Sequence, residues 1–214
     1  AVRSRGRGAI DLGRVAEAER AAQEGDALRV VELLGGWPAP LAVFLRTPDG
    51  QMLGPDARAT IARGLALLGS ACIDLGDPGK GEEVLRLAIQ YALEGEAAAD
   101  VYQRLGEALL ARQRPAEAIG PLRRAAVLGA PAEKVWPELA RAFLARQRRL
   151  AALGAMTRAR AAGVADETLA PIRLKLAEDL GVAFQSWEEA LASADPLSVA
   201  DPASVERSSS NPAP

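Results

Sequence analysis

Residues 99–132 read ADVYQRLGEALLARQRPAEAIGPLRRAAVLGAPA, and residues 133–166, which follow directly, read EKVWPELARAFLARQRRLAALGAMTRARAAGVAD. The two stretches align without a gap at an offset of 34 residues (133 − 99 = 34). The tetrapeptide Ala-Arg-Gln-Arg recurs at 111–114 and 145–148, at the same offset. A fixed period of this length indicates a helix–turn–helix unit that buries its apolar face by stacking on copies of itself.

The apolar positions of the two copies coincide, and the pairs are Tyr102 with Trp136, Leu105 with Leu139, Gly106 with Ala140, Leu109 with Phe143, Ala118 with Ala152, Leu122 with Met156, and Ala125 with Ala159. This order of large, Leu, small and large positions, followed by Ala-x-x-x-large, resembles the tetratricopeptide repeat (TPR) family. The resemblance implies an all-α, right-handed α-solenoid of stacked antiparallel helix pairs. It also implies a scaffold or adaptor in complex assembly, whose first helices line a concave groove for a partner protein.

An earlier copy of the repeat precedes these two, with Leu65, Leu68 and Cys72 in the core register. Its offset is longer (105 − 68 = 37), which places an insertion of three residues in the connecting loop at 95–97. The predicted organisation is therefore a basic arm at 1–9, a degenerate helix pair with an irregular insertion at 10–54, three TPR-like repeats at 55–166, a degenerate C-terminal helix pair at 167–192 and a disordered tail rich in Pro and Ser at 193–214.

Three places do not follow the helical pattern. The segment 36–54 contains a Pro-Asp-Gly turn signal at 48–50 and is predicted to be either a small hairpin or, as we favour, an irregular insertion. Pro121 falls inside a predicted second helix, which must bend there or be held by packing. Pro137 is accommodated if its helix begins near Glu133 and the proline stays within the first turn.

Composition narrows the chemistry. The chain has no His and one Cys, Cys72, so it offers no His-based triad, no Cys–His pair and no His or multi-Cys metal site. We therefore expect no enzyme, no catalytic residue, no metal and no cofactor. Cys72 lies on the core stripe, where a buried thiol is expected rather than a reactive one. The acidic pair at 82–83 begins a predicted helix, where the helix dipole accounts for it.

No run of about 18 uncharged apolar residues is present, so no membrane span is expected. The first residues lack the apolar segment of a signal peptide, which favours the cytoplasm. The sequence does not begin with Met, which is compatible with trimming, with a cleaved leader and with a longer precursor, so the compartment stays open. The sequence does not indicate an oligomeric state.

The face of the first helices opposite the core stripe supplies the candidate groove residues for a partner peptide or helix. Their charges alternate from one helix to the next, so the same residues could pair with each other as a ladder, and both interpretations are retained. These candidates are Arg63, Asp100, Gln103, Arg104, Glu107, Leu110, Lys134, Glu138, Arg141 and Leu144.

A second candidate surface is basic. Between Arg104 and Arg160 the chain has twelve basic and four acidic residues. Because turns of stacked repeats align, the turn arginines are expected to form one basic edge: Arg112, Arg114, Arg146, Arg148 and Arg149. The leading hypothesis is a non-enzymatic adaptor that binds a protein through the groove or this edge. The alternative is RNA or another polyanion on the edge at 104–160, a weaker hypothesis because exposed aromatic residues are not interleaved with the basic ones.

Overall fold

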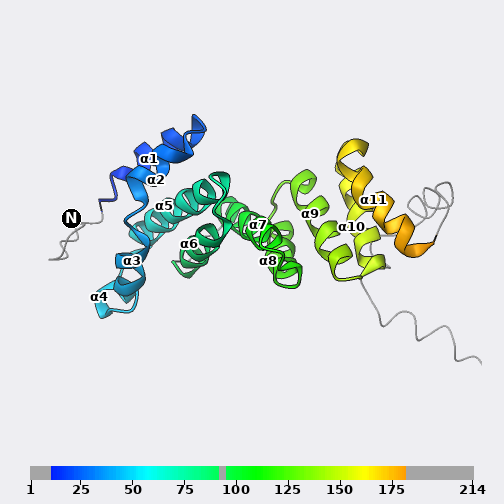
Figure 1. The fold of residues 1–214 in the computed structure, drawn as a ribbon. Helices are drawn as coiled ribbons and strands as arrows, with labels where there is room; N and C mark the ends of the chain where they lie inside the picture. The colour runs from blue at the N-terminus through cyan, green and yellow to red at the C-terminus, as the bar shows by residue number, and fades with distance from the viewer. Residues whose placement is uncertain (1–10, 92–94, 182–214) are drawn as a thin grey trace, which may run out of the picture. The chain divides into compact units, whose positions relative to one another are not determined.

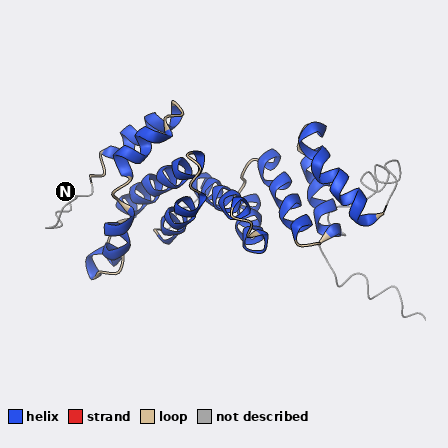
Figure 2. Ribbon diagram, viewed as in Figure 1, coloured by secondary structure: helices blue, strands red, loops and turns tan. Residues whose placement is uncertain are grey.

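The computed structural model describes residues 11–91 and 95–181. All regular secondary structure in this part of the chain is helical (Figure 2), and successive helices pack as pairs, which confirms the all-α expectation. The chain divides into two compact units, Ala1–Arg114 and Pro115–Pro214, which are described separately. The predicted arm at 1–9, the predicted tail and the second helix of the predicted C-terminal pair lie outside the described residues.

The first unit is built on α5, its longest helix (Figure 1). α5 packs against α6, its antiparallel partner, and also contacts α1, α2 and α7. The helices α1, α5 and α7 therefore touch in series, while α2 contacts both α1 and α5, and α6 contacts both α5 and α7. The bounds are α1 Arg14–Gln23, α2 Ala27–Leu34, α3 Pro38–Phe44, α4 Pro48–Gln51, α5 Pro55–Asp74, α6 Pro78–Gln90 and α7 Gly95–Ala111.

The second unit repeats this pairing. α9 packs between α8 and α10, and α11 packs on both α9 and α10. The bounds are α8 Pro115–Val127, α9 Ala132–Ala145, α10 Arg149–Ala161 and α11 Asp166–Leu180. α11 begins 34 residues after α9 (166 − 132 = 34), and its internal Pro171 stands 34 residues after Pro137. The sequence pattern was predicted to decay here, yet α11 starts in register as another first helix.

The prolines do not end these helices. Pro121 lies inside a continuous α8. For Pro137 the predicted helix start holds, because α9 begins at Ala132, beside Glu133, but the proline falls in the second turn and not in the first as expected. A proline there removes one backbone hydrogen bond. Pro137 is itself buried, so it lacks this backbone hydrogen bond but packs against the rest of the second unit.

A recurring turn closes the first helix of each pair. Its last residue has positive φ and is Gly25, Gly76, Gln113 (58°) or Gln147 (56°). The amide of the next residue then donates back to a carbonyl five positions earlier, which is the Schellman arrangement. These bonds are Asp26 to Ala21 at 2.8 Å, Asp77 to Cys72 at 2.9 Å, Arg114 to Leu109 at 2.8 Å and Arg148 to Phe143 at 2.9 Å. The repeat is therefore one of backbone conformation as well as of sequence.

The residue after this turn directly precedes the second helix. Asp26 and Asp77 cap α2 and α6 by accepting from the amides of Arg29 at 2.9 Å and Lys80 at 3.0 Å. Arg148 stands at the same position before α10 and makes no side-chain cap. A basic residue there also opposes the positive end of the helix dipole, so α10 begins less favourably than α2 and α6.

Two segments differ from the sequence prediction. Residues 36–54 form neither a hairpin nor an irregular insertion but the short helices α3 and α4, because Pro38 and Pro48 occupy first helical positions and Thr47 caps α4. Residues 95–97, expected in a loop, are the first turn of α7.

Trp37, which the sequence leaves either as a cap or as an exposed side chain, is buried. Its indole ring lies where a Cβ on Gly64 would stand, 2.7 Å from the nearest ring atom. The absence of a side chain at Gly64 is therefore what admits Trp37 against α5.

Candidate functional site

Small side chains leave a hollow of about 180 Å³ where α1, α5 and α7 meet. It lies on the face of α5 that the sequence assigned to the groove, and two predicted residues, Arg63 and Asp100, line it. The other lining residues are Glu19, Ala66, Leu67, Ser70 and Ala97. The small residues make room for the backbone of a ligand, and the charged ones stand ready to orient it.

Arg63 and Arg104 are already engaged with neighbouring helices. Arg63 lies 3.7 Å from Glu19 of α1, and both side chains stay substantially exposed. Arg104 donates to Glu107 at 2.8 Å, to the carbonyl of Ser70 at 3.3 Å and to the Asp74 carboxylate. Burial opposes the charge of Arg104, but the two carboxylates outweigh it and raise its pKa. Arg104 therefore ties α7 to α5, but through Asp74 and Ser70 and not through a residue of the predicted ladder.

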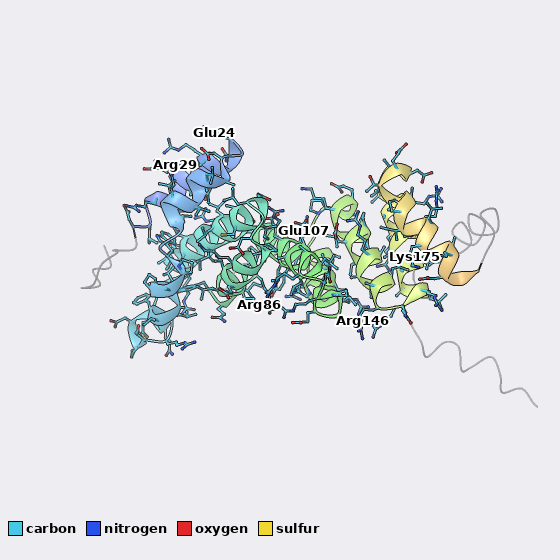
Figure 3. All side chains as sticks on the ribbon, in the orientation of Figure 1. Glu24, Arg29, Arg86, Glu107, Arg146 and Lys175 are labelled. Carbon is cyan, nitrogen blue, oxygen red and sulfur yellow. The ribbon has the colours of Figure 1, made fainter. Side chains whose placement is uncertain are left out.

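Gln103 departs from the prediction of an open groove residue, because it is only 3% exposed. Its amide donates to Glu107 at 2.9 Å, which satisfies part of its hydrogen-bonding capacity inside the protein. Glu107, labelled in Figure 3, thus receives hydrogen bonds from both Gln103 and Arg104. Leu110 is half-buried. Periodicity places Gln103 correctly off the apolar stripe but cannot show that the flank of the stripe is covered.

In the second unit, Lys134 and Arg141 are exposed, whereas Glu138 and Leu144 are half-buried. Arg141 pairs with Glu138, one turn earlier on α9. The predicted ladder pairs that join α9 to α7 link different units, and they stay predictions.

The predicted basic edge separates into two kinds of arginine. Arg112 and Arg114 both bind the carboxylate of Glu82, the latter at 2.7 Å. By contrast, Arg146 (labelled in Figure 3), Arg148 and Arg149 are exposed, and none of them pairs with a carboxylate of the described residues. Arg146, Arg148 and Arg149, at the turn between α9 and α10, are therefore available to bind an anion.

Glu82 is the one carboxylate among the described residues that is buried, at 5% exposed. It accepts from Arg86 at 2.9 Å in addition to Arg112 and Arg114. Burial opposes ionisation of Glu82, but the hydrogen bonds from Arg86 and Arg112 and the charge of Arg114 outweigh it, so its pKa is lowered. The helix dipole was the wrong explanation for this residue. The signal in the sequence was the Arg-x-Arg turn, whose partner lies about thirty residues earlier.

The reactive groups that the sequence offers are buried or dispersed. Cys72 is 3% exposed, and burial raises the pKa of its thiol, so it lies in the core as expected. Across residues 11–91 and 95–181, no three Cys, Asp or Glu side chains gather as metal ligands would. In the same residues no single helix has both the length and the hydropathy of a membrane span. α2 and α3 have the required length and hydropathy only when they are taken together, across a bend of 46°.

Trp136 and Tyr102, predicted to be dry core residues, are only half-buried, whereas Leu105, Leu109, Leu139 and Phe143 are buried as predicted.

Comparison with known proteins adds no relative from which a site could be transferred: no family model matches the chain, and the search of curated proteins returns no match.

Proposed function

We propose that this protein is a non-enzymatic adaptor, a TPR-like right-handed α-solenoid that holds an extended segment or helix of a partner protein along α1, α5 and α7. The hollow lined by Arg63, Ser70 and Asp100 carries the proposal, because it is where three first helices meet and their side chains do not fill the space. Hollows between helices are common positions for ligands.

The charges around the hollow suit a displaceable contact. Arg63 and Glu19 are 53% and 38% exposed, and such a pair contributes only about 0–1 kcal/mol. A partner can therefore replace it at little cost to the fold. Arg104 differs, because its own side chain is only 22% exposed and it binds Asp74 and the Ser70 carbonyl of α5 in addition to Glu107. We accordingly assign ligand contact to Arg63 and Asp100, and a structural role to Arg104.

The absence of His from the sequence and the burial of Cys72 support the non-enzymatic part of the proposal. General acid–base and nucleophilic catalysis draw most often on such groups. Glu82 is buried, and Glu107 accepts hydrogen bonds from two side chains. Both carboxylates are held by arginine or amide donors, so we assign them a structural role.

Ser70→Arg tests the site, because it places a long cation in the hollow while leaving the carbonyl that Arg104 uses. Gln90→Arg is the matched control, since it adds the same charge to an exposed position on α6. Chemical cross-linking in cells, followed by purification and mass spectrometry, should recover a protein with the wild type and with Gln90→Arg but not with Ser70→Arg. Equal recovery with Ser70→Arg, verified as folded by circular dichroism, would place the site elsewhere.

A further inference from the structure

A second hollow lies in the second unit, on the side of α9 that faces α8 and α10. Its volume is about 340 Å³. Trp136, Leu139 and Phe143 of α9 form its floor, and the α10 wall consists of the small residues Ala151, Gly154 and Ala155 together with Arg158. We call this hollow the Trp136 groove. Small side chains opposite a large aromatic one leave space that the fold itself does not occupy.

The corresponding position in the first unit is filled. Trp136 corresponds to Leu65 by the two repeat offsets (136 − 34 − 37 = 65), and Leu65 is fully buried. Trp37 belongs to the same cluster of buried side chains as Leu65 and occupies the space beside Gly64. In a helix pair of this kind, neighbouring side chains can therefore bury this position of the first helix completely. Trp136, by contrast, is only half-buried and lines the open Trp136 groove.

The rim of the Trp136 groove combines cations with apolar surface. The guanidinium of Arg158 lies 4.6 Å from the centre of the Trp136 ring, a cation–π contact. Arg123 lines the opposite wall on α8. Neither arginine pairs with a carboxylate of the described residues, and Val127, another lining residue, is 78% exposed.

The local charge is also one-sided. Residues 115–165 contain nine basic and three acidic side chains, so most of the basic ones have no acidic counterpart within this segment. An occupant of the Trp136 groove must therefore be partly apolar, to cover the floor, and negatively charged, to meet Arg123 and Arg158. A neutral apolar ligand would leave both guanidinium groups beside it without a partner.

We propose that the Trp136 groove binds an acidic peptide segment of a partner protein, with one large apolar side chain in the hollow and flanking carboxylates on Arg123 and Arg158. RNA fits less well, because Arg158 already covers a face of Trp136 and Phe143 is buried, so no aromatic platform is free to stack a base. This site is separate from the hollow of the first unit, and each can fail without the other.

The test measures fluorescence anisotropy of a labelled synthetic peptide, Gly-Glu-Glu-Trp-Glu-Glu-Gly, with the full chain. Arg123→Gln and Arg158→Gln should each weaken binding about tenfold, the usual size of a lost charge-assisted hydrogen bond. Ala151→Leu, which fills the hollow from the α10 side, should abolish it. The matched controls Arg124→Gln and Arg160→Gln remove equal charge from exposed positions that do not line the groove, and they should bind as the wild type does.

Several results would overturn the assignment. One is the absence of saturable binding by the wild type; another is equal loss with the Arg124 and Arg160 variants, which would indicate general charge attraction. Equal binding of a peptide with Gln in place of Glu would show that the carboxylates are not recognised. Undiminished binding to Ala151→Leu would show that the peptide does not enter the hollow. Tighter binding by an RNA oligonucleotide with the same residue dependence would assign the surface to nucleic acid. If Trp187→Ala strengthened peptide binding, the chain's own C-terminal segment would be the occupant instead of a partner.

Discussion

Replacing Glu82 by Gln should destabilise the first unit more than any other exchange of a carboxylate for its amide in the described residues. The variant keeps the size of the side chain but removes the charge that Arg86, Arg112 and Arg114 share. Breaking a fully buried ion pair costs about 3–5 kcal/mol. Here the arginine side chains are 34–47% exposed and stay hydrated, so we expect about 2 kcal/mol, close to the value of a hydrogen bond to a charged group.

Urea denaturation followed by circular dichroism measures this loss, with Glu83→Gln, an exposed neighbour, as the control. The effect should also depend on pH. The pKa of Glu82 is lowered in the folded protein, so its stabilisation is complete above the ordinary value of 4.5 and is lost as the pH falls through the folded-state pKa. The wild type and Glu82→Gln should therefore converge in acid. Equal destabilisation by Glu83→Gln, or a difference in stability that does not shrink in acid, would show that the charge of Glu82 does not stabilise the unit.

Three further substitutions test the packing. Arg148→Asp should raise the free energy of unfolding by about 1 kcal/mol, because it restores an N-cap at α10; an unchanged denaturation midpoint would contradict the cap. Tyr91→Phe should lower it by about 1–2 kcal/mol, since the buried hydroxyl donates to the Leu41 carbonyl at 2.8 Å; hydrogen exchange near α3 should rise with it. Gly50→Ala would place a Cβ 2.0 Å from the Phe44 carbonyl oxygen, so the turn between α3 and α4 must move, and faster proteolysis there is the expected sign.

The arginines at the turn between α9 and α10 should contribute to anion binding but not to the free energy of unfolding. Replacing Arg146 and Arg149 together by Gln should leave the free energy of unfolding within about 0.5 kcal/mol of the wild-type value, because both are exposed and unpaired within the described residues. Replacing Arg112 by Gln should lower it, because Arg112 binds Glu82. Equal effects of the two changes in urea denaturation would contradict the division of the predicted basic edge.

Local pattern was enough to predict the helical class, the turn at each repeat and much of the core. Leu105, Leu109 and Leu139 are buried as the 34-residue register requires, because helical periodicity decides which face of a helix is apolar. The same pattern missed α3 and α4, where proline begins short helices instead of a loop. It placed the degenerate C-terminal helix pair at 167–192, close to the observed start of α11 at Asp166, but it did not show that the 34-residue register continues there through Pro171.

The candidate sites depended on tertiary structure. Glu82 meets Arg112 across thirty residues of chain, and no local rule pairs them. Gln103 is covered although it is polar, and Trp136 is partly open although it is aromatic. In each case the exposure of a side chain depends on the neighbours that packed helices bring to it. Helical periodicity is enough to establish that helix pairs form and which stripe of each is apolar. Which charges pair and which hollows stay unfilled follows from the packing between helices, since both depend on side chains distant along the chain.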